Sequence, residues 1–208
     1  MGENRLNDIK KQKRNIRIFS SNALKIIACV SMLIDHIGIV FVDNNLFMRA
    51  VGRLAFPVFA FLLVQGLLRT SDVRRYLLRL GIFAVVSEMP FDLAMHDTIW
   101  YPGAQNIFFT LTAGLFAIYP MDSRGPIGRW KVEIALAAAL LAEFLRFDYG
   151  MAGVGIIVMF YLIEKERSGA DAYTLAYFNK KQNIEIVVLS SLVYILCLGM
   201  NQLYALLA

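Results

Sequence analysis

Charged residues and cysteines are both scarce in this sequence. Only 18% of the 208 residues are charged, whereas 58% are hydrophobic, and a mean hydropathy of +0.57 is too high for an ordinary soluble domain. The two cysteines, Cys29 and Cys197, lie within apolar stretches, and no metal-ligand spacing or disulfide framework is visible. The composition therefore excludes a small disulfide-stapled domain, and we expect no metal site.

The surplus of basic residues is modest and lies between the apolar stretches. The net charge is +5, but Lys and Arg cluster in the segments that separate hydrophobic runs, as membrane topology predicts. Nucleic-acid binding is therefore not expected. Residues 1–21 are polar and basic and lead into an apolar run without a small-residue cleavage site, so we expect a cytoplasmic basic amphipathic tail and not a signal peptide.

Seven apolar segments follow one another without a linker, which predicts one all-α domain over 22–208, a polytopic transmembrane helical bundle. The expected spans cover about 22–42, 46–68, 73–95, 105–119, 132–145, 151–163 and 184–207. The tail and the connections after the second, fourth and sixth spans carry most Lys and Arg residues, whereas the other connections have only Arg146. The positive-inside rule therefore predicts a cytoplasmic N-terminus.

Polar and ionisable residues interrupt these spans at one depth, near their outer ends. They are Asp35 and His36 in the first span, Arg49 and Arg53 in the second, Glu88 and Asp92 in the third, and Asn106 at the start of the fourth. Charges inside a membrane are costly and need partners of opposite sign. Structural ion pairs and a functional polar site both stay open as interpretations.

His36 is the candidate catalytic residue, although a lone histidine in an apolar helix is also compatible with a satisfied core residue. Histidine is the side chain whose ordinary pKa suits proton abstraction near neutral pH, and a carboxylate can orient its ring. Adjacent helical residues point about 100° apart, so we expect Glu88 or Asp92, and not Asp35, to orient His36. His96, in an outer loop, is expected to be solvated.

A second group of basic residues surrounds the cytoplasmic ends of the spans. Five of them are candidates to grip the phosphates of a cytosolic nucleotide or coenzyme: Lys25, Arg69, Arg74, Arg75 and Arg79. The positive-inside rule accounts for most of them without any ligand, so this interpretation is also left open.

Five motifs, taken in order, resemble one protein family. They are the stretch from Leu24 through Asp35-His36 to Gly38, Gly52-Arg53 with Pro57, Glu88-Met-Pro90-Phe-Asp92, Gln105-Asn106 with Thr110, and Asp148-Tyr149-Gly150. This pattern resembles the TraX family of integral membrane N-acetyltransferases, which are associated with acetylation of the amino terminus of conjugative pilin. The resemblance implies a bacterial inner-membrane enzyme that uses acetyl-CoA, with His36 as the catalytic histidine and Asp35 and Arg53 as its neighbours. It also implies that the basic inner residues hold the phosphates of acetyl-CoA.

We therefore expect an acyltransferase that moves an acetyl group from cytosolic acetyl-CoA to an amine or hydroxyl acceptor at the outer face, a protein amino terminus or a sugar. His36 would act as general base or carry the acyl group transiently, and Arg53 or Asn106 would stabilise the oxyanion. A small proton-coupled transporter and a non-catalytic membrane assembly factor are the alternatives. Family members continue past a segment like residues 202–206, so a C-terminal span is expected to be missing, naturally or by truncation.

Overall fold

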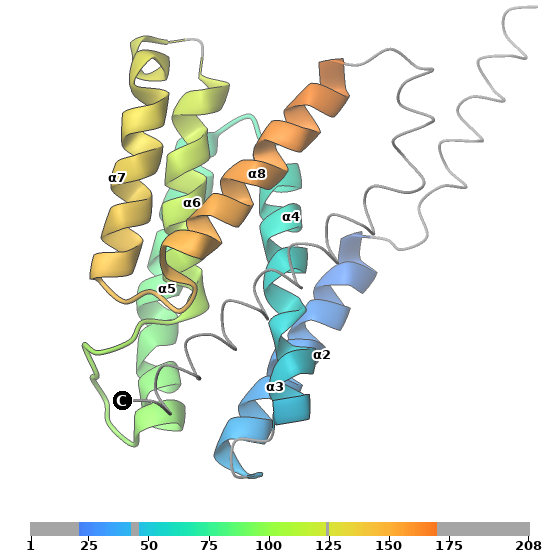
Figure 1. Ribbon diagram of the computed structural model, residues 1–208, viewed down its shortest axis with the longest axis vertical. Coiled ribbons are helices and arrows are strands. Elements are labelled where there is room, and N and C mark those ends of the chain that lie inside the picture. The colour runs from blue at the N-terminus through green and yellow to red at the C-terminus, as the bar shows by residue number, and fades with distance from the viewer. Residues whose placement is uncertain (1–20, 43–45, 124, 170–208) are drawn as a thin grey trace, which may run out of the picture.

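The computed structural model describes residues 21–42, 46–123 and 125–169, and within these ranges the chain is helical and contains no strand (Figure 1). The helices are α2 (Ser21–Val40), α3 (Leu46–Arg53), α4 (Ala55–Leu67), α5 (Val73–His96), α6 (Ile107–Asp122), η1 (Pro126–Trp130), α7 (Lys131–Phe144) and α8 (Gly150–Gly169). The all-α class is confirmed. The expected tail and the seventh span lie outside the described residues.

The described helices follow the expected segments closely, with one break. The second segment is divided into α3 and α4 at Leu54, because Pro57 has no N–H for the carbonyl of Arg53 and its ring crowds that carbonyl. Pro57 is tolerated in the first turn of α4, where backbone N–H groups have no partner within the helix. The break places Arg53 at the end of a short helix.

Two helical stretches, Ser21–Val40 and Phe47–Leu67, are long and apolar enough to cross a bilayer by length and composition, and α6 is a shorter apolar helix. The remaining described helices do not meet this criterion. The expected number of seven spans and the cytoplasmic N-terminus are therefore not confirmed.

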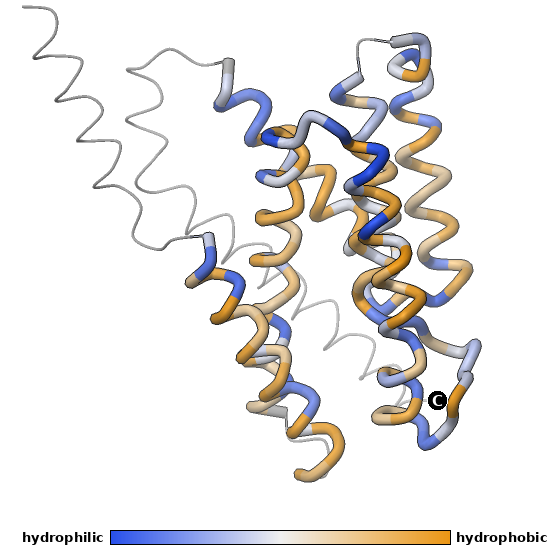
Figure 2. Tube along the Cα trace, turned by 180° about the vertical axis from the view of Figure 1, so that it is seen from behind, coloured by the Kyte–Doolittle hydropathy of each residue, from blue (hydrophilic) through white to orange (hydrophobic). Residues whose placement is uncertain are grey.

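Successive long helices run in opposite directions, so the connections gather at two ends of the bundle (Figure 1). We call one the basic end: it comprises the start of α2, residues 68–79, residues 125–131 and the last turns of α8, and it holds most of the described Lys and Arg residues. The other, called here the opposite end, comprises residues 41–42, 97–106 and 145–149 and the turns of α2, α3, α5 and α6 next to these connections. Hydrophobic residues dominate much of the helix length between them (Figure 2).

The core lies between α4, α6 and α8. Phe56, Val64, Leu115, Ile157 and Tyr161 are fully buried there. α6 packs against α4, α5, α7 and α8, which makes it the central helix of the described part. The packing of these four helices around α6, with α4 and α8 parallel to it and α5 and α7 antiparallel (Figure 1), fixes the relative height of residues at both ends.

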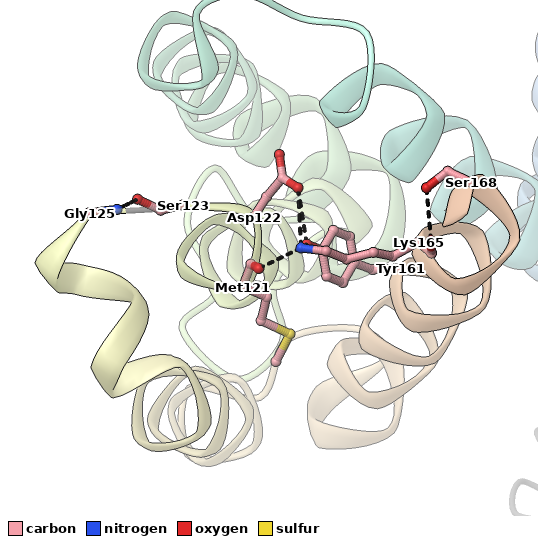
Figure 3. A network of polar contacts seen from close by, with 7 residues as sticks. All are labelled: Met121, Asp122, Ser123, Gly125, Tyr161, Lys165 and Ser168. Carbon is pink, nitrogen blue, oxygen red and sulfur yellow. Dashed lines mark hydrogen bonds and ion pairs between the residues drawn. The ribbon is translucent and has the colours of Figure 1, made fainter. Parts of the chain in front are cut away.

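A polar network joins α8 to the end of α6 at the basic end (Figure 3). The Lys165 ammonium donates to the Met121 carbonyl oxygen at 2.8 Å and to the Tyr161 hydroxyl at 2.6 Å, and the Tyr161 hydroxyl donates to Asp122 at 3.1 Å. Met121 lies in the last turn of α6, where carbonyl oxygens have no partner within the helix. Lys165 thus caps α6 and fixes it against α8.

Candidate functional site

His36 lies in the second half of α2 with its ring held by its own helix. Nδ1 is 2.7 Å from the Met32 carbonyl oxygen, one turn earlier. A carbonyl oxygen can only accept, so Nδ1 carries a proton, and the neutral form of the ring has its lone pair on Nε2. The expectation that Glu88 or Asp92 orients His36 is therefore wrong for Nδ1, because a backbone carbonyl takes that role.

Asp35 lies where α2 and α3 approach most closely. A Cβ added at Gly52 would collide with the Asp35 side chain, so only glycine permits this contact. One carboxylate oxygen, Asp35 Oδ1, is buried without a hydrogen-bond partner among the described residues. The close approach brings the Asp35–His36 pair of α2 beside Arg53, one residue after Gly52.

Arg53 meets the connection between α7 and α8. Its guanidinium lies 3.9 Å from Asp148 Oδ1 and 5.6 Å from the centre of the Tyr149 ring. The Tyr149 ring stacks on Phe56 at 3.9 Å, and its backbone N–H donates to the hydroxyl of buried Thr110 at 3.4 Å. These contacts fix the connection over the core and hold a carboxylate next to Arg53.

Electrostatic interactions join Asp148 to the histidine. Desolvation raises the pKa of the Asp148 carboxyl above its ordinary value, and the charge of Arg53 opposes this rise. Asp35 raises the same pKa further, whereas His36 and Arg49 lower it. We call these five residues, Asp35, His36, Arg49, Arg53 and Asp148, the histidine site. The group carries both signs of charge around one imidazole.

A second polar group lies between α5 and the start of α6. Asn106 is the N-cap of α6, and its side-chain oxygen accepts from Phe108 N at 2.9 Å. Its side-chain nitrogen donates to Glu88 Oε2 and, at 2.9 Å, to the Ala84 carbonyl oxygen. Glu88 also accepts from the Asn106 backbone N–H at 3.1 Å. Glu88 and Asn106 are both buried, so this pair ties α6 to α5 through satisfied polar groups.

Asp92 lies one helical turn beyond Glu88 and is fully buried. Its Oδ2 accepts from the backbone N–H of Tyr101 at 2.8 Å, and no hydrogen-bond partner reaches Oδ1 among the described residues. His96 is half-buried, and its ring stacks on Tyr101 at 4.0 Å, so His96, which we expected to be solvated, is only partly exposed. Asp92 and His96 together hold the connection between α5 and α6.

The two polar groups are joined by backbone hydrogen bonds. Gln105 N donates to the Arg146 carbonyl at 3.1 Å, and Asp148 N donates to the Gln105 carbonyl at 3.0 Å. Gln105 precedes the Asn106 cap, and Asp148 belongs to the histidine site. The connections before α6 and before α8 therefore form one rigid unit at the opposite end.

A cavity of about 550 Å³ opens at the basic end between α2, α4, α5 and α6. Its lining includes Lys25, Arg75 and Arg79 together with Thr70 and Ser71. Three of the five candidate phosphate-binding residues thus line one cavity, and they come from two helices that are distant in sequence, α2 and α5.

The two remaining candidates lie elsewhere. Arg69 donates to the Gln65 side chain at 2.9 Å, and Arg74 lies beside Leu77 and Leu78 on the outer face of α5. Neither side chain is among those that line the cavity.

The candidate catalytic residues fall into two sets. Asp35, His36 and Arg53 come together in the histidine site, whereas Glu88, Asp92 and Asn106 form the second group. Sequence reasoning left Asp148 out of the candidates, although it belongs to the motif Asp148-Tyr149-Gly150. That motif precedes α8 in a short connection at the same end as Arg53, and this position could have indicated that Asp148 would lie near Arg53.

These features define a class of protein: an all-helical bundle with helices of membrane-spanning length and a histidine–arginine–carboxylate site at one end. Residues 20–207 match the family model for TraX protein. The chain belongs to the TraX family, and the predicted resemblance is confirmed. No solved structure matches it.

Two relatives illustrate the range of the family. The chain is 30% identical over 175 residues to the probable fimbrial assembly protein FimC, serogroup H1, of Dichelobacter nodosus, an alignment that covers 78% of this chain and 70% of that protein. It is 27% identical over 154 residues to protein TraX of Escherichia coli. The second alignment covers 73% of this chain and 59% of the relative, so the chain spans less than two thirds of that protein.

Proposed function

We propose that this protein is a multi-pass bacterial inner-membrane acetyltransferase that takes its acetyl group from cytosolic acetyl-CoA. The observation that carries the proposal is one face of α2. Lys25, Met32 and His36 are spaced by seven and four residues, so at 100° per residue they lie within about 40° of one another. The face that begins at the basic cavity ends at the histidine.

The surface of α5 supports a membrane location beyond the two apolar helices. Leu78, Ile82, Val85, Met89 and Leu93 are exposed at spacings of three and four residues and form an apolar stripe along the helix. Glu88 and Asp92 are buried instead. A helix with its carboxylates inside, its arginines near one end and an apolar face outside suits a lipid environment, and the 24 residues of α5 extend about 36 Å.

The distribution of Lys and Arg supports a cytoplasmic basic end. In that orientation the cavity with Lys25, Arg75 and Arg79 faces the compartment that contains acetyl-CoA. Cationic side chains form charge-assisted hydrogen bonds with phosphate oxygens. Lys25 and His36 are separated by about 16 Å along α2, a distance suited to a donor whose phosphates and reacting thioester lie at opposite ends of a long arm.

The histidine site suits acyl transfer. Nε2 of His36 takes the proton from the acceptor amine or hydroxyl as the acceptor attacks the thioester carbonyl, and Arg53 stabilises the oxyanion that forms. The C–S bond then breaks, and the CoA sulfur leaves and receives the proton from His36. The products are an acetylated acceptor and CoA. Attack by Nε2 itself, with a transient acetyl-imidazole, satisfies the same balance.

The test uses the full chain purified in detergent. Acetyl-CoA should raise the melting temperature of the wild type in a concentration-dependent way. Labelled acetyl-CoA is then offered with a peptide that has a free amino terminus or with a hexosamine, to separate the two acceptor classes. His36→Gln should retain the thermal shift and lose transfer. Undiminished transfer by folded His36→Gln would contradict the mechanism.

A second candidate function is assembly of a surface fibre without catalysis, which is favoured by the name of the Dichelobacter nodosus relative as a probable fimbrial assembly protein. Fibre assembly in a deletion strain separates the two functions. If His36→Gln restores assembly as well as wild type does while acetyl transfer is absent, the assembly role does not require the chemistry.

A further inference from the structure

The basic cavity has a polar mouth and an apolar inner part. Thr70, Ser71, Asp72 and Arg75 lie in or next to the connection that opens α5. Beyond Arg79, the inner part is lined mostly by apolar side chains of three helices: Phe59, Leu62 and Leu63 of α4, Leu80 of α5, and Phe108 and Leu111 of α6. Such a cavity suits an amphiphilic ligand whose charged groups stay at the mouth.

The position of α6 sets how deep the cavity extends. The Asn106 side chain donates to the Ala84 carbonyl, so the first turn of α6 lies beside the middle of α5. The ring of Phe108 meets the Phe83 ring edge-on at 4.6 Å. From Asp72 at the mouth to the level of Phe83 is eleven residues, or about 16 Å along α5.

Phe108 is held firmly at this inner end. Its backbone N–H donates to the cap oxygen of Asn106 at 2.9 Å, and its ring is fixed by the edge-on contact with Phe83. Asn106 and Glu88 are buried nearby and bonded to one another. A longer chain entering from the mouth would have to displace the ring or separate this buried, hydrogen-bonded pair, and both are unfavourable.

We propose that Phe108, together with Phe59 on the facing helix α4, limits the length of the acyl group that the cavity accepts. This inference rests on the proposed function and adds a selectivity for short acyl chains to it. The thioester lies at the inner limit of the cavity, and the acyl group extends toward the two rings. Phe59 is one turn from Phe56, whose ring stacks on Tyr149, so this limit adjoins the connection that contacts Arg53. Acetyl fits in front of the rings, whereas a longer chain meets Phe108.

The experiment compares acetyl-, butyryl- and octanoyl-CoA binding to the detergent-purified full chain by competition. Wild type should prefer acetyl-CoA. Phe108→Ala removes the ring and should move the affinity ratio of butyryl- to acetyl-CoA by about tenfold in favour of butyryl-CoA, as expected for two newly accommodated methylene groups. Phe116→Ala is the matched control, since Phe116 is on the same helix, exposed and outside the cavity lining.

The outcomes separate the two proposals. If wild type binds acetyl-CoA and Phe108→Ala retains that binding with the wild-type chain-length preference, the length limit is wrong and the donor site stands. If wild type binds none of the three compounds, both proposals fail. Should Phe108→Ala not fold, Phe59→Leu, which shortens the facing wall, must shift the preference in the same direction, or the inference is overturned.

Discussion

The two ends of the bundle differ in how far their polar side chains are exposed to solvent. At the basic end, charges are exposed: the Arg75–Asp72 pair, at 3.3 Å, has side chains 68% and 43% exposed. At the opposite end, Glu88, Asp92, Asn106 and Thr110 are buried. The side chain of Arg53 is only 11% exposed. The basic end keeps most of its charges in contact with solvent, except the Arg167–Glu164 pair at 24% and 11% exposure. The opposite end encloses these polar groups but leaves Asp148 35% exposed.

This difference in exposure indicates that the basic end is suited to ligand binding and that the opposite end contributes to stability. Exposed ion pairs contribute little to stability, so the charges of the basic end can exchange their partners for a ligand at little cost to the fold. Buried polar groups must be satisfied, and removing one partner leaves the other uncompensated. We therefore expect substitutions at the basic end to change affinity and substitutions at the opposite end to change stability or chemistry.

The sharpest test of this comparison is His36→Gln against His96→Gln, since both histidines belong to the opposite end. Loss of the proposed general base should reduce the proposed acetyl transfer by about 10²- to 10⁴-fold, with acetyl-CoA binding at the other end retained. His96 packs on Tyr101, so His96→Gln should reduce acetyl transfer far less than His36→Gln does. Transfer rates and the thermal shift with acetyl-CoA are measured on the same samples. Equal losses in both variants would indicate a structural role for this end.

Asn106→Ala tests whether the buried polar groups stabilise the fold, and the free energy of unfolding is the quantity measured. The change removes the cap of α6 and two hydrogen bonds to buried groups of α5. The free energy of unfolding should fall by about 2–4 kcal/mol, combining a lost cap with an unsatisfied buried acceptor. Reversible unfolding in mixed micelles measures this fall.

Ser87→Ala is the control for Asn106→Ala. The Ser87 hydroxyl donates only within α5, to the Phe83 carbonyl at 2.6 Å, so its loss should have little effect. If Asn106→Ala and Ser87→Ala unfold with the same free energy, the Glu88–Asn106 pair does not support the fold.

At the basic end, Arg75→Ala and Arg74→Ala form a matched pair of neighbours. Arg75 lines the cavity, whereas Arg74 lies on the outer face of α5. Loss of one charge-assisted contact with phosphate should weaken acetyl-CoA binding about tenfold or more in Arg75→Ala, and Arg74→Ala should bind as wild type does. Calorimetric titration measures both affinities. Equal weakening would mean that the general positive charge of this end, and not the cavity, attracts the donor.

The helices themselves were predictable, because apolar segments of defined length and the clustering of Lys and Arg between them mark where helices begin and end. The break at Leu54 follows from Pro57 and the carbonyl of Arg53. Pairing between helices was not predictable in the same way. Glu88 and Asn106 are 18 residues apart, and nothing in their spacing indicates that an N-cap would meet a buried carboxylate.

The candidate site shows the same limit. The sequence placed His36 and Arg53 at one depth, and the structure brings them to one site. It did not indicate that Nδ1 would be bound by Met32 of the same helix, because a backbone carbonyl carries no residue-specific signal. Nor did the sequence indicate that Lys25 and Arg75 would line the cavity and Arg69 would not, since the wall of a cavity depends on how α2, α4 and α5 pack.

The smallest expected effect is that of Lys165→Met at the basic end. Lys165 makes several contacts with α6, but its side chain is 47% exposed in the ion pair with Asp122, and water replaces much of what the ammonium provides. The unfolding free energy should fall by less than about 1 kcal/mol, and Tyr161→Phe should have a larger effect because Tyr161 is fully buried. Unfolding of both variants in mixed micelles gives the comparison. If Lys165→Met were the more destabilising change, exposed charges at this end would support the fold, and the contrast between the two ends would not hold.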